Sequence, residues 1–268
     1  MKAFTEHLRN ATINFLLKQK IAVTPSTDTK DLLQLIKLLR PVTTNKPLIR
    51  LGPDTDGGYL IPDDLEGIEA CFSPGVSTVA GFEKDCANRG MEVFMADKSI
   101  NELPETHPRF HFIKKFISST NDTDFITLDS WANQVLKEKE SDLMLQMDIE
   151  GYEFETIFSL SDQLKDRFRI IVVEFHCMHL LWSKPFFDLS KRAFMKLLQN
   201  HSVVHIHPNN LGKTVSRNNI EIPELLEITF LRNDRISSRE YTKSFPHKLD
   251  INNMGSAPLI LPASWYTD

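Results

Sequence analysis

Residues 143–153 read LMLQMDIEGYE, and this stretch decides the fold class. Its first five residues form a mostly apolar run with the length of a buried strand, and charged residues follow at once. Asp148 stands directly after the run, and Gly151 opens the next helix. A carboxylate at the end of a buried strand needs solvent or a partner, so we expect Asp148 to enter a cleft. The stretch therefore predicts a strand, a functional turn and a helix, the repeating unit of an α/β fold.

The same alternation continues along the chain on both sides of this stretch. Apolar runs predict seven strands, at Ile68–Phe72, Met91–Ala96, Phe110–Ile113, Leu143–Met147, Ile170–Phe175, Val203–Ile206 and Leu226–Leu231. Helical periodicity predicts helices at Thr78–Arg89, Thr127–Leu136, Glu153–Leu160 and Ser190–Leu198. No helix separates the last two strands, so we expect the last strand to run antiparallel. The pattern predicts a doubly wound α/β domain with a seven-stranded sheet.

The first 47 residues have a different pattern, which predicts a helical N-terminal extension at residues 1–47 and a main domain at residues 48–268. Apolar residues recur near helical spacing over residues 4–16 and 32–39, and Pro41 ends the second helix. Two apolar stripes outside a sheet must bury against something. We therefore expect them to cover the cleft or to form the interface of a homo-oligomer.

The composition narrows the class of partner. The chain has 268 residues and a net charge of −5, which argues against nucleic-acid binding because that function needs a basic face. Cys71, Cys86 and Cys177 are far apart and form no CxxC pair, so we expect reduced thiols and a cytoplasmic protein. No apolar run approaches the ~20 residues of a membrane span, and we find no signal-peptide core.

The turns after the first three strands contain the candidate cofactor-binding residues. Ser73 and Gly75 follow the first strand, where a glycine lets the backbone approach a ligand. Asp97 follows the second strand, where a carboxylate can accept the hydroxyls of a ribose or cap a helix. Phe116 and Ile117 follow the third strand, where an adenine ring could be sandwiched. The G-x-G-x-x-G fingerprint is absent, which favours a cofactor other than NAD, although an ordinary turn would have the same pattern.

The order of several motifs resembles that of the FkbM-type methyltransferases. In that family the fourth strand ends in Asp-x-Glu-Gly-x-Glu, as Asp148–Glu153 does here. The other stretches that resemble the family are Asp56–Tyr59, Gly81–Glu83, Thr127–Asp129, Val173–His176, His205–Asn210 and Glu227–Phe230. The resemblance implies a Rossmann-like methyltransferase sheet, S-adenosylmethionine as the cofactor with Asp148 close to it, and O-methylation, often of sugars or polyketides. The single glycine of the first loop departs from the family and leaves the contacts to the methionine part open.

Four polar side chains are expected at the carboxyl edge of the sheet: Asp148, Glu174, His176 and His207. Glu174 and His176 alternate on one strand and should face the same side, as should His205 and His207 on the sixth strand. Two interpretations stay open: a polar network that orients a hydroxylated substrate, or a site for magnesium or manganese built from the four residues. His207 reaches the others only if Pro208 turns the chain inward, because the seventh strand can insert between the fifth and the sixth.

These patterns together predict an S-adenosylmethionine-dependent O-methyltransferase that acts on a hydroxyl of a small molecule or glycan, with sugars and polysaccharides favoured. Asp148, His176 and His207 are the candidate catalytic residues, with one histidine as the base because imidazole titrates near neutral pH. A metal ion would instead lower the pKa of the hydroxyl. Two rival classes are an NAD-dependent oxidoreductase and a non-catalytic nucleotide-binding module of the same fold. The absent glycine fingerprint counts against the first, and the acid and histidine cluster counts against the second.

Overall fold

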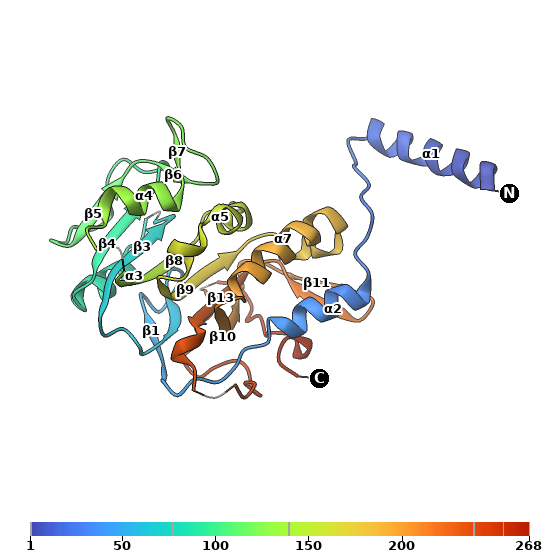
Figure 1. The fold of residues 1–268 in the computed structure, drawn as a ribbon. Helices are drawn as coiled ribbons and strands as arrows, with labels where there is room; N and C mark the ends of the chain where they lie inside the picture. Colours follow the sequence, from blue (N-terminus) through green and yellow to red (C-terminus); the bar gives the residue numbers. More distant parts are fainter. Residues whose placement is uncertain (1, 77, 139, 238, 254, 268) are drawn as a thin grey trace.

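The computed structural model describes residues 2–76, 78–138, 140–237, 239–253 and 255–267, without the side chains of residues 2–5 and 8. Its centre is a seven-stranded sheet in the order β5-β4-β3-β8-β9-β13-β10 (Figure 1). The strands are β3 Ile68–Pro74, β4 Glu92–Ala96, β5 Phe110–Ile113, β8 Asp142–Met147, β9 Phe168–Phe175, β10 His201–Pro208 and β13 Leu226–Arg232. β13 inserts between β9 and β10 and runs antiparallel to both. The other neighbours in the sheet, β5 with β4, β4 with β3, β3 with β8 and β8 with β9, pair in parallel. The predicted doubly wound sheet with an antiparallel last strand is confirmed.

The limits of several elements differ from the prediction, among them those of β10 and α7. β10 extends beyond the predicted Val203–Ile206 at both ends, because His201 and His207 interrupt the apolar run without interrupting the strand. α7, Lys184–Leu197, begins well before the predicted Ser190. Ser183 precedes this helix and a proline stands in its first turn, which is a helix-start signal that apolar periodicity alone does not detect.

Helices cover one face of the sheet, and a helix with a strand hairpin covers the other. The elements are α4 Leu128–Val135, α5 Glu153–Ser159 and α7 on the first face, and α3 Gly81–Asn88, β1 Leu48–Leu51 and β2 Tyr59–Pro62 on the second. On the first face Trp131, Phe154 and Phe194 join the main core. On the second face the Thr229 hydroxyl of β13 donates a hydrogen bond of 2.6 Å to the Leu60 carbonyl of β2. The hairpin of β1 and β2 is therefore fastened over the strands that carry the predicted edge cluster.

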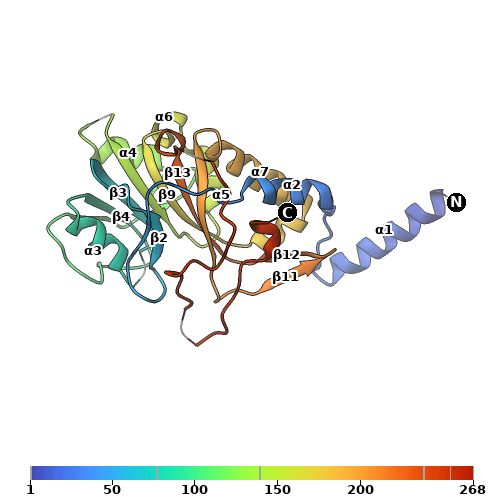
Figure 2. The same cartoon turned by 90° about the horizontal axis from the view of Figure 1, so that it is seen from below.

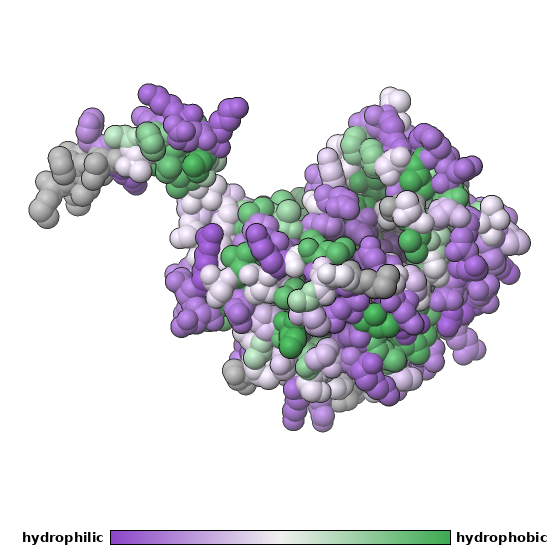
Figure 3. All heavy atoms as spheres, turned by 180° about the vertical axis from the view of Figure 1, so that it is seen from behind, coloured by the Kyte–Doolittle hydropathy of each residue, from purple (hydrophilic) through white to green (hydrophobic). Residues whose placement is uncertain are grey.

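The two predicted N-terminal helices form, but only one of them packs on the sheet. α2, Thr29–Leu38, buries Leu32, Leu35 and Ile36 in the main core, with Asp28 as its N-cap. α1, Lys2–Lys18, stands clear of the body in Figures 1 and 3. Its Phe15 is 62% exposed. The apolar stripe of α1 therefore does not cover the cleft, and a homo-oligomer interface stays a prediction, as does the division at residue 47.

Several short elements have no counterpart in the prediction. They are β6 Phe116–Ile117, β7 Phe125–Ile126, β11 Thr214–Arg217, β12 Ile220–Pro223, α6 Asp162–Lys165, and the 3-10 helices η1 Met178–Trp182, η2 Asn233–Arg235 and η3 Ala263–Trp265. Elements of two to five residues are too short to produce a periodic pattern. Figure 2 shows the C-terminal segment running beside the hairpin of β11 and β12. There the Trp265 indole donates to the Glu221 carbonyl at 3.0 Å.

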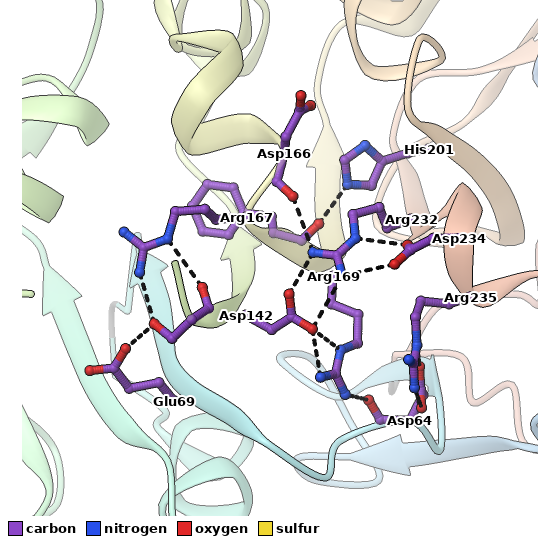
Figure 4. Close-up of polar contacts among 12 residues, drawn as sticks. Asp64, Glu69, Asp142, Asp166, Arg167, Arg169, His201, Arg232, Asp234 and Arg235 are labelled. Carbon is purple, nitrogen blue, oxygen red and sulfur yellow. Dashed lines mark hydrogen bonds and ion pairs between the residues drawn. The ribbon is translucent and has the colours of Figure 1, made fainter. Parts of the chain in front are cut away.

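A network of ion pairs at the amino-terminal edge of β8 and β9 ties the strands of the site together (Figure 4). Asp142, at the start of β8, accepts hydrogen bonds from Arg169 of β9 at 2.7 Å and from Arg232 of β13 at 2.6 Å. Arg235 lies 2.7 Å from the Asp64 carboxylate, and Arg169 donates to the Asp64 carbonyl at 2.8 Å. The hydrogen bond from Arg235 holds the pKa of Asp64 below its usual range. Because Asp64 follows β2, the network also anchors the hairpin.

Within the described ranges, we find no helix that is both long and apolar enough to span a bilayer.

Candidate active site

A cavity of about 440 Å³ opens at the carboxyl ends of β3, β4 and β8. The residues that line it are Asp56, Gly75, Ala96, Asp97, Ser99, Phe116, Ile117, Phe125, Asp148, Ile149, Glu150 and Tyr152. Open α/β sheets bind their ligands at this edge, outside the point where the strand order reverses. Apart from Ser73, all the predicted cofactor residues line this cavity.

At Gly75, the turn after β3 comes close to the turn after β8. Its φ is +90°, and a Cβ atom added there would lie 1.6 Å from the carbonyl oxygen of Asp148. Its N–H donates to the Ala96 carbonyl at 3.0 Å. The single glycine of this loop is therefore required both by its backbone conformation and by the approach of the β8 turn.

Asp97 stands at the end of β4 and is buried, with 6% of its surface exposed. Its Oδ1 accepts hydrogen bonds from the backbone N–H and the hydroxyl of Ser99, both at 2.7 Å. No helix begins between Asp97 and β5 among the described residues, so these bonds close a short turn, and the structure does not bear out the helix-capping interpretation. Asp97 also lines the cavity, so its hydrogen bonds to Ser99 are compatible with ligand binding at this position.

Aromatic side chains form one wall of the cavity. The rings of Phe116 and Phe125 lie 5.6 Å apart, and those of Phe125 and Tyr152 lie 6.2 Å apart. Ile117 and Ile149 also line the cavity. The sequence predicts Phe116 and Ile117 as residues of this wall. It does not predict Phe125 of β7 or Tyr152, directly before α5, because no local pattern marks them as cavity residues. This apolar wall is suited to stacking a planar ring.

A smaller cavity of about 70 Å³ adjoins the first, and Asp56, Gly75 and Asp148 line both. Its other lining residues are Gly57, Tyr59, Val76, Thr78, Val79, Glu83 and Gln146. Ser73 lies behind it and lines neither cavity, because its hydroxyl bonds to Glu83 and Gln146. Burial raises the pKa of Glu83 to about 7. The side chain of Ser73 therefore supports the floor of the cleft, and its predicted contact with the cofactor stays a prediction.

The lining of the two cavities is acidic. It contains five carboxyl groups, those of Asp56, Glu83, Asp97, Asp148 and Glu150, and neither lining includes a lysine or an arginine. A cleft lined by charges of one sign attracts ligands of the opposite sign. This lining therefore favours a cation over a polyphosphate.

His176 connects the cleft to a buried carboxylate. Its Nδ1 lies 3.0 Å from Oε1 of Glu153, and its Nε2 lies 3.4 Å from Glu150 and 3.8 Å from Asp148. The strand β9 ends at Phe175, one residue before His176. The strand alternation that predicts one side for Glu174 and His176 therefore stops before His176, which turns towards α5.

Asp148 and His176 both have raised pKa values. Burial raises the pKa of Asp148 to about 8, and the charge of Glu174 adds to this effect. Burial alone would lower the pKa of His176, but its hydrogen bond to Glu153 and the charges of Glu153, Asp148 and Glu174 raise it to about 9. The expectation that His176 titrates near neutral pH is corrected by these neighbours, which favour its protonated form.

The predicted set of metal ligands does not meet at one point. Among the described residues, Asp148, Glu150 and His176 offer atoms within 4.8 Å of one another, and neither Glu174 nor His207 belongs to this group. An imidazolium between two carboxylates balances much of their charge without an ion. We therefore treat the group as an ion-pair cluster and assign no metal ligands in it.

Residues 78–197 match the model of the methyltransferase FkbM domain. This chain carries an FkbM-type methyltransferase domain. A comparison with curated protein sequences finds no match.

Among solved structures, the chain is similar to a protein of Anabaena variabilis described as a methyltransferase from an antibiotic biosynthesis pathway. The identity is 14%, the TM-score is 0.27, and the match covers 53% of this chain and 58% of the other. It is also similar to the 1,6-didemethyltoxoflavin-N1-methyltransferase of Burkholderia thailandensis, which was solved with bound 1,6-didemethyltoxoflavin and S-adenosylhomocysteine. There the identity is 12%, the TM-score is 0.30, and the coverage is 62% of this chain and 72% of the other.

The FkbM match contains most of the candidate site and ends at α7. Asp97, Phe116, Asp148 and His176 lie inside it, as does Glu153. The Gly75 turn, the hairpin of β1 and β2, and the last two strands of the sheet lie outside the matched residues. The floor of the cleft is thus completed by parts of the chain beyond the match.

A row of polar residues continues from the FkbM-type domain across those last strands. Glu174 of β9 pairs with Glu227 of β13, and Glu227 pairs with His207 of β10. Asp148 lies beside Glu174, one residue beyond the last paired position of β8. Directly paired residues project from the same face of a sheet. Burial raises the pKa of Glu174 to about 7 and the pKa of Glu227 well above its usual range. Glu227 is not among the predicted site residues, although the stretch Glu227–Phe230 resembles the family and its charge interrupts an apolar strand.

The structure separates His207 from His176. His205 lies 2.8 Å from Oδ1 of Asp250, and His207 lies 3.7 Å from Oδ2. Burial alone would raise the pKa of Asp250, but the hydrogen bonds and charges of the two histidines hold it well below its usual range. Because β13 lies between β9 and β10, His207 stands two strands beyond Glu174, and Pro208 does not bring it into the group at Asp148.

Amide side chains link this outer row to the cleft. Asn209 donates to Glu174 at 3.1 Å. Asn253 donates to Asn209 at 2.9 Å and to Asp56 at 3.2 Å. The C-terminal segment thus reaches the hairpin turn that lines both cavities, a contact for which the sequence has no local signal.

Proposed function

We propose that the protein transfers a methyl group from S-adenosylmethionine to a hydroxyl of a small molecule or glycan, with sugars and polysaccharides as the favoured acceptors. The observation that carries the proposal is the acidic two-part cleft at the carboxyl edge of an FkbM-type domain. When bound, the cofactor supplies an electrophilic methyl group on a positively charged sulfur. The residues of the chain have to hold this cation, orient the acceptor and take up its proton.

The larger cavity suits the adenosine part of the cofactor. Asp97 is placed at the end of β4 to accept the ribose hydroxyls, and Phe116, Ile117 and Tyr152 offer apolar surface to the adenine ring. Gly75 lines both cavities, and a side chain there would collide with the turn after β8. These residues fit a neutral nucleoside and provide no basic group for a pyrophosphate.

The smaller cavity suits the methionine part of the cofactor. It contains carboxylates for the ammonium group, and Tyr59 and Thr78 for polar contacts. Asp148 borders both cavities, where the sulfonium would lie between them. A cation beside these carboxyl groups favours their ionised forms, although burial raises the pKa values of Glu83 and Asp148, and this mutual stabilisation is the physical reason for preferring S-adenosylmethionine over NAD.

The acceptor side of the cleft supports O-methylation. A hydroxyl needs a base, and His176 beside Asp148 can take its proton, with Asp148 positioning the acceptor. His207 stands apart beside Asp250, so we assign it no direct contact with the acceptor. A cytoplasmic location, a homo-oligomeric state and a requirement for magnesium or manganese stay predictions, and loss of methyl transfer on chelation would support the last.

Parallel calorimetry with S-adenosylhomocysteine and NAD tests the proposal. We expect S-adenosylhomocysteine to bind and NAD to give no heat. Asp97→Ala should weaken S-adenosylhomocysteine binding by about 1–3 kcal/mol through the loss of charge-assisted hydrogen bonds. Asp188→Ala, a change on the outer part of α7, should leave it unchanged. Tight NAD binding, or binding of neither ligand, would contradict the assignment.

A further inference from the structure

Glu153 has more contacts than a helix cap requires. It is 0% exposed at the start of α5. Its Oε1 accepts a hydrogen bond from the Gly151 N–H at 2.9 Å and also lies 3.0 Å from Nδ1 of His176. Its Oε2 is buried without a hydrogen-bond partner among the described residues. An ionised carboxylate is costly in such a place unless a positive or strongly polar neighbour stabilises it, and His176 is that neighbour.

The contact at Nδ1 decides which nitrogen of His176 faces the cleft. A carboxylate at one ring nitrogen holds the proton there, so the other nitrogen is the one that exchanges protons with the substrate. That other nitrogen, Nε2, lies on the side of Glu150 and Asp148, and Asp148 lines both cavities. Glu153, His176 and the cleft thus form a line from buried carboxylate to imidazole to acceptor.

The backbone on both sides of this line is held in an unfavourable conformation. Glu150 has a φ of 55° and Cys177 a φ of 57°, both in the left-handed region that residues other than glycine seldom adopt. Glu150 lies in the turn after β8, and Cys177 directly follows His176. Such strain persists only where the surroundings enforce it, and it concentrates at functional sites.

We propose that Glu153 is a positioning residue for methyl transfer, which holds Nδ1–H of His176 so that Nε2 receives the proton of the acceptor hydroxyl. The inference rests on the proposed function. In the transfer the acceptor O–H bond breaks and the oxygen bonds to the methyl carbon, while the electrons of the S–C bond stay on sulfur. The proton goes to Nε2 of neutral His176, and Glu153 keeps its charge throughout.

The positioning role has a direct consequence for the pH dependence. The titratable groups that face His176 are Glu153 from α5, Asp148 and Glu150 from the turn after β8, and Glu174 from β9; the thiol of Cys177, next in the chain, is exposed. The hydrogen bond to Glu153 and the charges of Glu153, Asp148 and Glu174 outweigh burial and raise the pKa of His176 to about 9. Turnover should therefore rise with pH until His176 loses its proton. Glu153→Gln keeps the size of the side chain and removes its charge, so it should lower this pKa and move the rise to lower pH.

An NMR titration of the His176 ring in the protein without cofactor tests the first half of the proposal. In the wild type, His176 should titrate above the usual value of about 6.5. Glu153→Gln should lower its pKa, and the matched control Glu155→Gln, from the same turn of α5, should not. A wild-type pKa at or below the usual value would overturn the proposal even if the variant fails to fold.

Turnover of S-adenosylmethionine with methyl glycosides of glucose, galactose, mannose and rhamnose tests the second half. Glu153→Gln should reduce kcat by about 10²-fold at its pH plateau, as expected when a base loses its orienting charge. The affinity for S-adenosylhomocysteine should stay within about twofold. Glu153→Asp, which keeps the charge, should keep the pH profile nearer to that of the wild type. A kcat profile that does not follow the measured pKa of His176 would refute the proton route, whereas failure of the wild type to bind S-adenosylhomocysteine would refute the proposed function and leave the NMR result intact.

Discussion

Replacing Gly75 by alanine tests the geometry on which the whole cleft depends. A Cβ atom there would lie 1.6 Å from the Asp148 carbonyl oxygen, and real Cβ atoms essentially never approach closer than 3.0 Å. The turn after β8 would therefore have to retreat by at least about 1.4 Å, the difference between these two distances. Misplacing a catalytic group by about 1 Å can cost about 10²-fold in rate. We therefore expect Gly75→Ala to reduce kcat/KM by at least about 10²-fold.

Gly90→Ala is the matched control for this change. Gly90 has a φ of +94°, close to the +90° of Gly75, but an added Cβ atom there meets nothing within 4 Å. Both variants should lose about 1–2 kcal/mol of stability from the left-handed backbone. Only Gly75→Ala should also lose S-adenosylhomocysteine affinity, measured by calorimetry, and turnover, measured by product formation. Equal activity in the two variants would refute the close approach of the two turns.

Two further predictions concern stability. Deleting residues 2–23 removes α1 and should leave the thermal midpoint nearly unchanged. Deleting residues 2–39 should unfold the protein, because it also removes four core side chains that each contribute about 2–5 kcal/mol, those of Leu32, Leu35, Ile36 and Leu39. Circular dichroism and gel filtration distinguish these outcomes, and a folded, monomeric product of the longer deletion would contradict the packing of α2. Asp250 has a lowered pKa, so its contribution to stability is present above the unfolded value of about 3.9 and is lost as the pH falls through the folded value. Asp250→Asn should reduce stability at pH 7 by about 1–3 kcal/mol and flatten its acid dependence in urea titrations; an unchanged acid slope would show that the pair with His205 does not form.

The centre of the fold and one half of the cleft could be predicted from the sequence. The strand runs are local patterns, so they predict the seven strands without information on tertiary contacts. Parallel strands bring their carboxyl ends to one edge, and this rule was enough to place Gly75, Asp97 and Asp148 together. The position of Ser73 on its strand does not reveal that its hydroxyl is buried against Glu83 and Gln146.

The tertiary structure decided which polar side chains of β9, β13 and β10 lie in a row beside the cleft. The order of β9, β13 and β10 places Glu227 between Glu174 and His207, and this order depends on long-range strand pairing, for which the sequence has no periodic signal. His176 does not follow the alternation of β9 because the strand ends one residue earlier, and its ring contacts Glu153 of α5 instead.

By itself, the sequence determined which residues lie at strand ends, because burial periodicity and turn chemistry act over a few neighbouring positions. The tertiary structure determined their partners and protonation. Asp250 meets His205 across 45 positions, and Asn253 meets Asp56 across 197. The pKa values of Asp148 and His176 likewise follow from burial and from charges that other elements bring close. Such contacts form only when packing brings together segments that are distant in sequence and excludes water from between them.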